Sequence, residues 1–299
     1  MRTIRIPLRP LALIGLATAG LVTMGGSAGQ AADPFIAGGR STRTLPATPD
    51  QLAQARSRGA LLAAALGMPG VTRRVERLDD RFEHRAYDEV SSFDAAGREV
   101  AIARFGLDGS VQMAVTLGWR GTAARGIEAS AVASRAAALA RAAGLTIATT
   151  PEVQPSSGGG GWSVAWPRRV DGVAVRGDGL RLMIWPDGSF HGLSLTERPL
   201  AAAPSSPIDR LTAESAARTV LAARVPAAAP DLAPTAAELV WVAANDTFAA
   251  SRVDAPAERL RLAWAVRFES RGALVDRLHA VEVWIDAGDG QPLGGDIVQ

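Results

Sequence analysis

Three Asp-Gly pairs, at residues 108–109, 187–188 and 289–290, each stand between two stretches in which apolar and polar residues alternate. Alternation with a period of two is typical of a strand with one buried face, and Asp-Gly between two such stretches favours a tight hairpin. A stretch with helical periodicity precedes each set of strands. The sequence therefore predicts one helix followed by antiparallel hairpins, three times over.

The predicted helices have recognisable ends. Thr48 and Gln51 form a capping box, in which each side chain accepts a hydrogen bond from the other residue's backbone amide, and Gly67 is placed to end that helix. A second helix is expected over residues 128–143, along one apolar stripe. Thr212 is expected to cap the third.

Helices with one apolar stripe and strands that alternate bury their surfaces by packing against each other. We therefore expect the α+β class, with three tandem modules that each pack a helix on an antiparallel β-sheet. The modules are expected at residues 48–120, 127–198 and 208–299. Residues 33–47 are expected to be a flexible lead-in, and residues 151–161 a glycine-rich loop.

Residues 1–32 have the three parts of a secretory signal. Three arginines precede an uncharged apolar run over residues 11–24, and small residues follow as far as Ala32. The run is too short for an ordinary membrane-spanning helix. We expect cleavage after Ala31 or Ala32 and a secreted or extracytoplasmic protein; an uncleaved membrane anchor is the alternative.

Charge and cysteine content exclude several classes of protein. The absence of cysteine excludes disulfides, a cysteine nucleophile and a lipid-modified cysteine anchor. The formal net charge is +2, and removal of residues 1–32 takes away three arginines and no acidic residue, which leaves about −1. No block of roughly five like charges is present. We therefore expect no nucleic-acid partner.

Residues 284–296 have the sequence WIDAGDGQPLGGD, which is rich in aspartate and glycine. A calcium loop of the EF-hand type needs a closing glutamate, and a phosphate loop needs Gly-Lys-Ser/Thr at the start of a helix. Neither is present. We interpret the stretch as a hairpin turn in which Asp289 and Gly290 supply the residues with positive φ. An incidental calcium site is the alternative.

The third module resembles the PepSY and related propeptide-type domains of secreted bacterial proteins. The resemblance rests on the helix LTAESAARTVLAA, the strand LAWAVRF and the ending VEVWIDAGDGQPLGG, and the second module contributes WSVAWPRRVDGVAV and IWPDGSFHG. It implies a cystatin-like α+β module without catalytic residues. It also implies a role in inhibiting, assisting the folding of, or regulating secreted proteases.

Motifs for catalysis or metal binding were sought among the polar residues. No His pair has metal-site spacing, and each module contains one histidine in a strand pattern: His84, His191 and His279. The pairs Asp79-Asp80 and Asp88-Glu89 are interpreted as solvated charges rather than an acid–base pair. We predict no catalytic residue, no metal and no cofactor.

The seven tryptophans are the strongest candidates for a binding surface. Most are expected in the core, because an alanine-rich protein needs bulky side chains to fill its volume. Trp162 and Trp166 lie four residues apart in one predicted strand, so they share a face beside the glycine loop. They are the predicted binding residues.

These features favour a secreted, non-catalytic protein that interacts with a peptide or a secreted protease. An envelope structural or assembly factor is the alternative, and an enzyme of unrecognised type is the less favoured one.

The signal interpretation predicts the mass of the exported protein. The mature chain should begin near Asp33, so its intact mass should lack residues 1–32. Mass spectrometry of the exported form tests this, and a mass that includes those residues would indicate a retained anchor.

Overall fold

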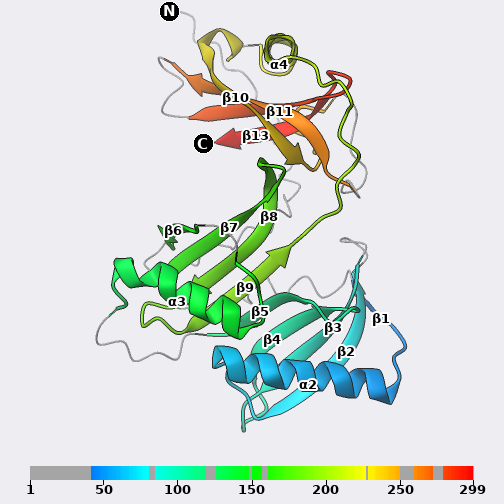
Figure 1. The fold of residues 1–299 in the computed structure, drawn as a ribbon, viewed down its shortest axis with the longest axis vertical. Helices are drawn as coiled ribbons and strands as arrows, with labels where there is room; N and C mark the ends of the chain where they lie inside the picture. Colours follow the sequence, from blue (N-terminus) through cyan, green and yellow to red (C-terminus); the bar gives the residue numbers. More distant parts are fainter. Residues whose placement is uncertain are drawn as a thin grey trace, which may run out of the picture.

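The computed structural model describes residues 42–80, 85–118, 126–147, 150–156, 161–226, 228–249, 259–271 and 279–298. These residues form a mixed α+β fold with a 13-stranded sheet and three α-helices (Figure 1). The helices are α2 (Pro49–Leu66), α3 (Ala129–Ala142) and α4 (Arg210–Arg224). The strands are β1 (Thr42–Thr44), β2 (Thr72–Asp80), β3 (Arg85–Phe93), β4 (Glu99–Gly106), β5 (Val111–Thr116), β6 (Glu152–Pro155), β7 (Trp162–Val170), β8 (Val173–Ile184), β9 (Phe190–Thr196), β10 (Leu232–Val242), β11 (Arg261–Ser270), β12 (Ala280–Asp286) and β13 (Pro292–Val298).

The helix ends largely follow the sequence prediction. Thr48 caps α2 with the complete capping box, and Gly67 ends it in the left-handed conformation with φ 68°. The prediction for α4 was wrong by one turn: Asp209 is the N-cap, and it accepts a 2.8 Å hydrogen bond from the Thr212 amide. Thr212 therefore occupies the first turn of the helix. Aspartate is as good a cap as threonine, and only the observed backbone distinguishes the two.

The three predicted Asp-Gly hairpins join β4 to β5, β8 to β9, and β12 to β13. Gly109, Gly188 and Gly290 have φ of 88°, 82° and 72°, whereas the aspartates before them do not have positive φ. A shift in strand register precedes each turn. The turns thus place only glycine in the left-handed region and add a bulge, which strengthens the local twist.

A fourth Asp-Gly pair makes a hairpin that the sequence did not predict. The sequence VDGVAV of residues 170–175 favours a single strand, but Asp171 (φ 51°) and Gly172 (φ 80°) turn the chain between β7 and β8. Two successive residues with positive φ are the signature of a type I′ turn. Two short strands, β1 and β6, also lie in stretches where we expected a flexible lead-in and a loop.

Strands β2, β3, β4, β5, β9, β8, β7 and β6 form one continuous stretch of sheet, because β5 pairs with β9. The registers align one apolar row across all eight strands: Val75, Val90, Ala103, Ala114, Leu193, Leu182, Val164 and Val153. α2 contacts β2 and β3, and α3 contacts β7 and β8. Burial of this row beneath the helices stabilises the sheet through the hydrophobic effect.

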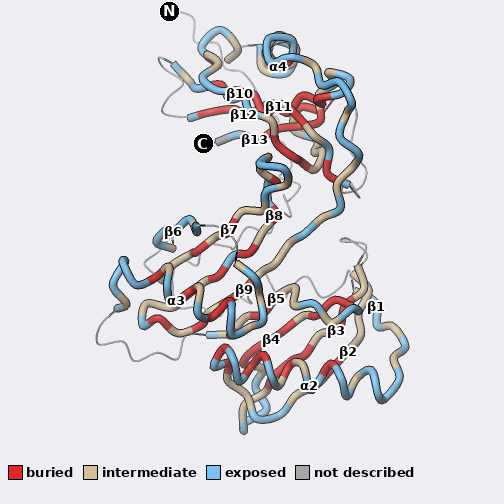
Figure 2. The backbone as a smooth tube through the Cα atoms, in the orientation of Figure 1, coloured by how far each residue is buried: buried red, intermediate tan, exposed pale blue. Residues whose placement is uncertain are grey.

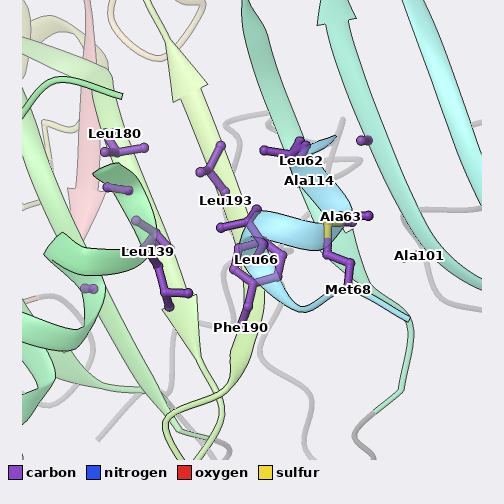
Figure 3. Close-up of a cluster of buried hydrophobic side chains, with 14 of the residues drawn as sticks. Leu62, Ala63, Leu66, Met68, Ala101, Ala114, Leu139, Leu180, Phe190 and Leu193 are labelled. Atoms are coloured by element: carbon purple, nitrogen blue, oxygen red, sulfur yellow. The ribbon is translucent and has the colours of Figure 1, made fainter. Parts of the chain in front are cut away.

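The two helices share one hydrophobic core. Side chains from α2, α3 and β9 gather in a single cluster that includes Leu66, Leu139 and Phe190 (Figure 3). Figure 2 shows the buried residues concentrated between the helices and the strands. α2 approaches β3 so closely that a Cβ on Gly59 would lie 2.6 Å from Val90 Cγ1. The first two helices and their strands are therefore packed as one body.

The remaining strands form a four-stranded part with its own core. α4 contacts β11 and β12, and Leu221, Phe268 and Ile285 belong to the cluster between them. The opposite face of these strands carries a second cluster, which includes Trp284 and receives Ala174 from β8. In Figure 1 the tip of the β7–β8 hairpin points at this part.

β8 connects the two parts because it has different neighbours along its length. Ala174 and Val175 pair in parallel with Val240 and Trp241 of β10. On the same side of β8 that faces β10, the second half of the strand, from Gly179 onward, pairs with β9 instead.

A buried carboxylate lies where β8 changes partner. The Asp178 side chain is fully buried and accepts hydrogen bonds from Arg168 Nη1 at 3.1 Å and Arg198 Nε at 2.6 Å. The Arg198 backbone amide donates a further bond of 2.7 Å. Arg168 lies on β7, and Arg198 lies in the chain that leaves β9. Asp178 therefore holds three segments together at the branch of the sheet.

No helix in the described ranges is long and apolar enough to cross a membrane.

Asp178→Asn should lower the free energy of unfolding by about 3–5 kcal/mol, because it leaves two arginines around a site that no longer carries the compensating charge. Denaturant unfolding measures the change. Glu197→Gln is the matched control, since Glu197 is exposed nearby, and its effect should stay within about 0.5 kcal/mol. Equal, small effects of both substitutions would contradict the role given to Asp178.

Candidate functional site

The predicted binding residues Trp162 and Trp166 pack against the core. Trp166 is only 6% exposed and belongs to the cluster beneath α2 and α3, and the half-buried Trp162 packs against the same cluster. The Trp166 ring is therefore too buried to offer a stacking surface to a ligand. A contact of Trp162 with a ligand stays a prediction. Trp241 and Trp284 are also buried, as predicted for most tryptophans.

The acidic pairs singled out in the sequence are ion-paired across strands. Asp88 is 1% exposed, and its two oxygens accept hydrogen bonds of 2.8 and 3.1 Å from Arg77, directly opposite on β2. The hydrogen bonds that Arg77 donates to this carboxylate raise the pKa of Arg77. Glu89 pairs with Arg104 at 2.9 Å. The interpretation of Asp88 as a solvated charge was wrong, because its side chain is buried and paired with Arg77 of β2.

The stretch WIDAGDGQPLGGD forms a hairpin turn as predicted, but the prediction of positive φ was right for Gly290 (φ 72°) and wrong for Asp289. Asp286 Oδ1 accepts hydrogen bonds from the backbone amides of Gly288 (2.8 Å) and Asp289 (3.1 Å), and its Oδ2 pairs with Arg261 at 2.8 Å. These contacts use the carboxylate within the protein. A Cβ on Gly294 would lie 2.2 Å from Asn245 Oδ1, so this glycine allows a close backbone approach.

The histidines do not converge in the part of the chain that can be described. His191 stacks on Trp185 with ring centroids 3.8 Å apart, and His279 precedes β12. His84 lies outside the described residues. Within those ranges no group of three or more His, Asp or Glu side chains is arranged to hold a metal ion.

A polar cluster lies where β8 meets the four-stranded part. Arg176 Nη2 contacts Glu238 Oε1 on β10 at 2.9 Å and Glu282 Oε2 on β12 at 3.0 Å. The indole of Trp284 donates a 2.8 Å hydrogen bond to Glu282 Oε1. We call Arg176, Glu238, Glu282, Trp284 and Asp296 the joint cluster. Together these contacts fix the tip of β8 against the face opposite α4.

Asp296 adds a further carboxylate to the joint cluster. It lies directly across the sheet from Glu282. Loss of hydration raises the pKa of Asp296, the nearby Glu282 raises it further, and Arg176 opposes the shift. A perturbed carboxyl group beside a charged pair is one mark of a functional site, although ion-pair networks perturb pKa values too.

β10 has an unpaired side next to the joint cluster. β11 pairs with β10 from Leu232 to Val242, but β8 pairs only with Val240 and Trp241. No described strand pairs with that side of β10 over residues 232–239. Pro234 and a shift in register interrupt the first half. The regular part of the open side is therefore residues 236–239.

The other described edges of the sheet are protected to different degrees. On β13, Asn245 covers Gly295 with two side-chain hydrogen bonds of 2.9 and 3.0 Å and donates its amide to Leu293. β6 has four residues and ends in Pro155. Such devices suppress unwanted strand pairing. β1 covers only Leu78–Asp80 of β2, so no described strand pairs with that side of β2 over residues 72–77. The open side of β10 differs from that of β2 because the joint cluster lies beside it.

This site can offer two kinds of interaction. Free backbone N–H and C=O groups on β10 can form a ladder with an added strand. The carboxylates of the joint cluster can bind a cationic side chain beside that strand. Sequence analysis missed the site, because Arg176, Glu238 and Glu282 are far apart in the chain and only the β8–β10 pairing brings them together.

Comparison with known proteins gives little further guidance. No protein-family model matches the sequence, and no curated protein matches it. Among solved structures, the Bacillus megaterium YpeB C-terminal domain is similar, with a TM-score of 0.47 and 11% sequence identity. The match covers 86% of this chain and 99% of that one. At this identity the likeness concerns the fold alone and assigns no role to any residue.

The raised pKa of Asp296 predicts a pH-dependent effect of Asp296→Asn. Because the folded state holds this proton more tightly than the unfolded chain, ionised Asp296 costs stability. That cost is absent below the ordinary pKa of 3.8 and grows as the pH rises through the folded-state pKa. Asn, which carries no charge, should therefore raise the melting temperature at pH 7.5 but not at pH 3.

Melting curves of the parent and the variant at both pH values test this. A gain of the same size at pH 3 and pH 7.5 would mean that the substitution acts through something other than the charge of Asp296.

Proposed function

We propose that this chain is an extracytoplasmic, non-catalytic protein that binds an extended segment of another polypeptide, with a secreted protease or its precursor as the favoured partner. The segment adds to the open side of β10 as an extra strand. The observation that carries the proposal is the unpaired side of β10 over residues 236–239, with the carboxylates of the joint cluster beside it.

The proposal includes three tandem modules of PepSY-like type. The contacts of α2 with β2 and β3, of α3 with β7 and β8, and of α4 with β11 and β12 support a repeated helix-on-sheet unit. The glycine turn with a register shift, which recurs after β4, β8 and β12, supports it too. The first two units are fused through β5 and β9, whereas the third is joined to them through the short β8–β10 pairing, which leaves one side of β10 open.

Strand addition suits such an edge for a physical reason. Unpaired main-chain groups on a strand gain hydrogen bonds from any extended peptide, and the side chains on either face then select which peptide binds. The half-buried Ala237 and Leu239 and the exposed Glu238 provide different surroundings on the two faces.

The test combines capture with hydrogen exchange. The chain from Asp33 onward is immobilised and exposed to the culture fluid and envelope extract of its own organism, and bound proteins are identified by mass. We expect a protease or its precursor, and amide exchange of residues 236–239 should slow when the purified partner is added. The same partner should lose activity or gain stability when mixed with this protein.

Amides of β13 near Gly295 are the internal control, because Asn245 already covers them. Protection confined to surfaces other than β10 would refute strand addition. Capture of envelope proteins alone would favour an assembly factor over a protease partner.

A further inference from the structure

The protein already contains an example of what the β10 edge accepts. The segment Ala174–Arg176 of β8 lies beside β10, pairs in parallel with Val240 and Trp241, and places Arg176 on Glu238 and Glu282. Val175 packs with Trp241 in a small apolar cluster. At Val240 and Trp241, the β10 edge is therefore paired with a segment in which an apolar residue, Val175, is followed by an arginine, Arg176.

The joint cluster contains more acidic than basic side chains, so a second cation could bind there. Glu238, Glu282 and Asp296 face a single bridging arginine, Arg176. Two further arginines of β11 on this face have acidic partners of their own: Arg261 pairs with Asp286 at 2.8 Å, and Arg267, opposite Glu282, contacts Glu269 at 3.4 Å. The Glu238 side chain is 61% exposed although it contacts Arg176, so its carboxylate is accessible from solvent.

Side chains alternate between the two faces of a strand, so the two faces of β10 offer different side chains to a strand that pairs with it. Ala237 packs toward α4 with the core of the four-stranded part, and Leu239, two residues on, shares that face. Glu238 lies between them and points to the joint cluster. Directly opposed side chains on neighbouring strands have Cβ atoms about 4.5–5.5 Å apart. One face of the edge is therefore apolar and the other is acidic.

We propose that the segment bound at β10 alternates apolar residues, which face Ala237 and Leu239, with an arginine or lysine that pairs with Glu238. This inference rests on the proposed strand addition and specifies its ligand: a basic, alternating, extended peptide. The pattern is the same for parallel and antiparallel addition, since side chains alternate in both.

The probe is an acetylated, amidated octapeptide that repeats residues 173–176 of this chain, VAVRVAVR. In an extended strand its four valines lie on one face, and its alanines and arginines lie on the other. The matched peptide is VAVEVAVE, which has the same shape and the opposite charge. Binding to the chain from Asp33 onward is measured by calorimetry, and amide exchange locates the peptide.

We expect the arginine peptide to bind and to protect the amides of residues 236–239 from exchange. The affinity of the glutamate peptide should be lower by at least about five-fold. Glu238→Gln should weaken binding of the arginine peptide by about two- to five-fold, the size expected for an exposed ion pair. Glu269→Gln, an exposed acidic residue of β11 away from the edge, is the control and should leave binding unchanged. Melting curves confirm that both variants fold.

The outcomes separate this inference from the proposed function. Equal binding of both peptides, with protection of β10, would overturn the charge preference and leave strand addition standing. Equal loss in Glu238→Gln and Glu269→Gln would overturn the role of Glu238. No binding and no protection with either peptide would overturn both.

Discussion

The arrangement of this protein depends on the buried carboxylate of Asp178. A charge without access to water is tolerated only when opposite charges and hydrogen bonds surround it, and Arg168, Arg198 and the Arg198 amide meet this need. Because the two arginines come from β7 and from the chain beyond β9, the carboxylate fixes three segments at one point. That point is the branch from which the four-stranded part departs.

The branch also explains why β10 has an open side. The first residues of β8 pair with β10 and its later residues pair with β9. β8 therefore covers β10 only at Val240 and Trp241. The rest of β10 extends past β8. Val175 is the last residue of β8 that pairs with β10, and Arg176 follows it. Arg176 contacts Glu238 and Glu282, so a charged side chain lies next to the open side of β10. An open edge beside a cluster of carboxylates thus follows from one division of pairing along one strand.

Much of the local structure could be predicted from the sequence. The capping box of Thr48 and Gln51, the helix over residues 128–143 and the three Asp-Gly hairpins depend on residues close together in the chain, whose hydrogen bonds are local. Mistakes arose where two local solutions are nearly equal in energy. Asp209 and Thr212 are both good caps, and Asp171-Gly172 looked like part of a strand because valines flank it.

By itself, the sequence determined the α+β class, the three helices and most of the strands, since these follow from short-range propensity and alternation. The tertiary structure alone decided that β5 pairs with β9, that β8 divides its pairing between β9 and β10, and that Asp178 and Arg176 find their partners. Those contacts join residues far apart in the chain. Many alternating strands could pair equally well by pattern, and the choice depends on packing and charge compensation across the whole molecule.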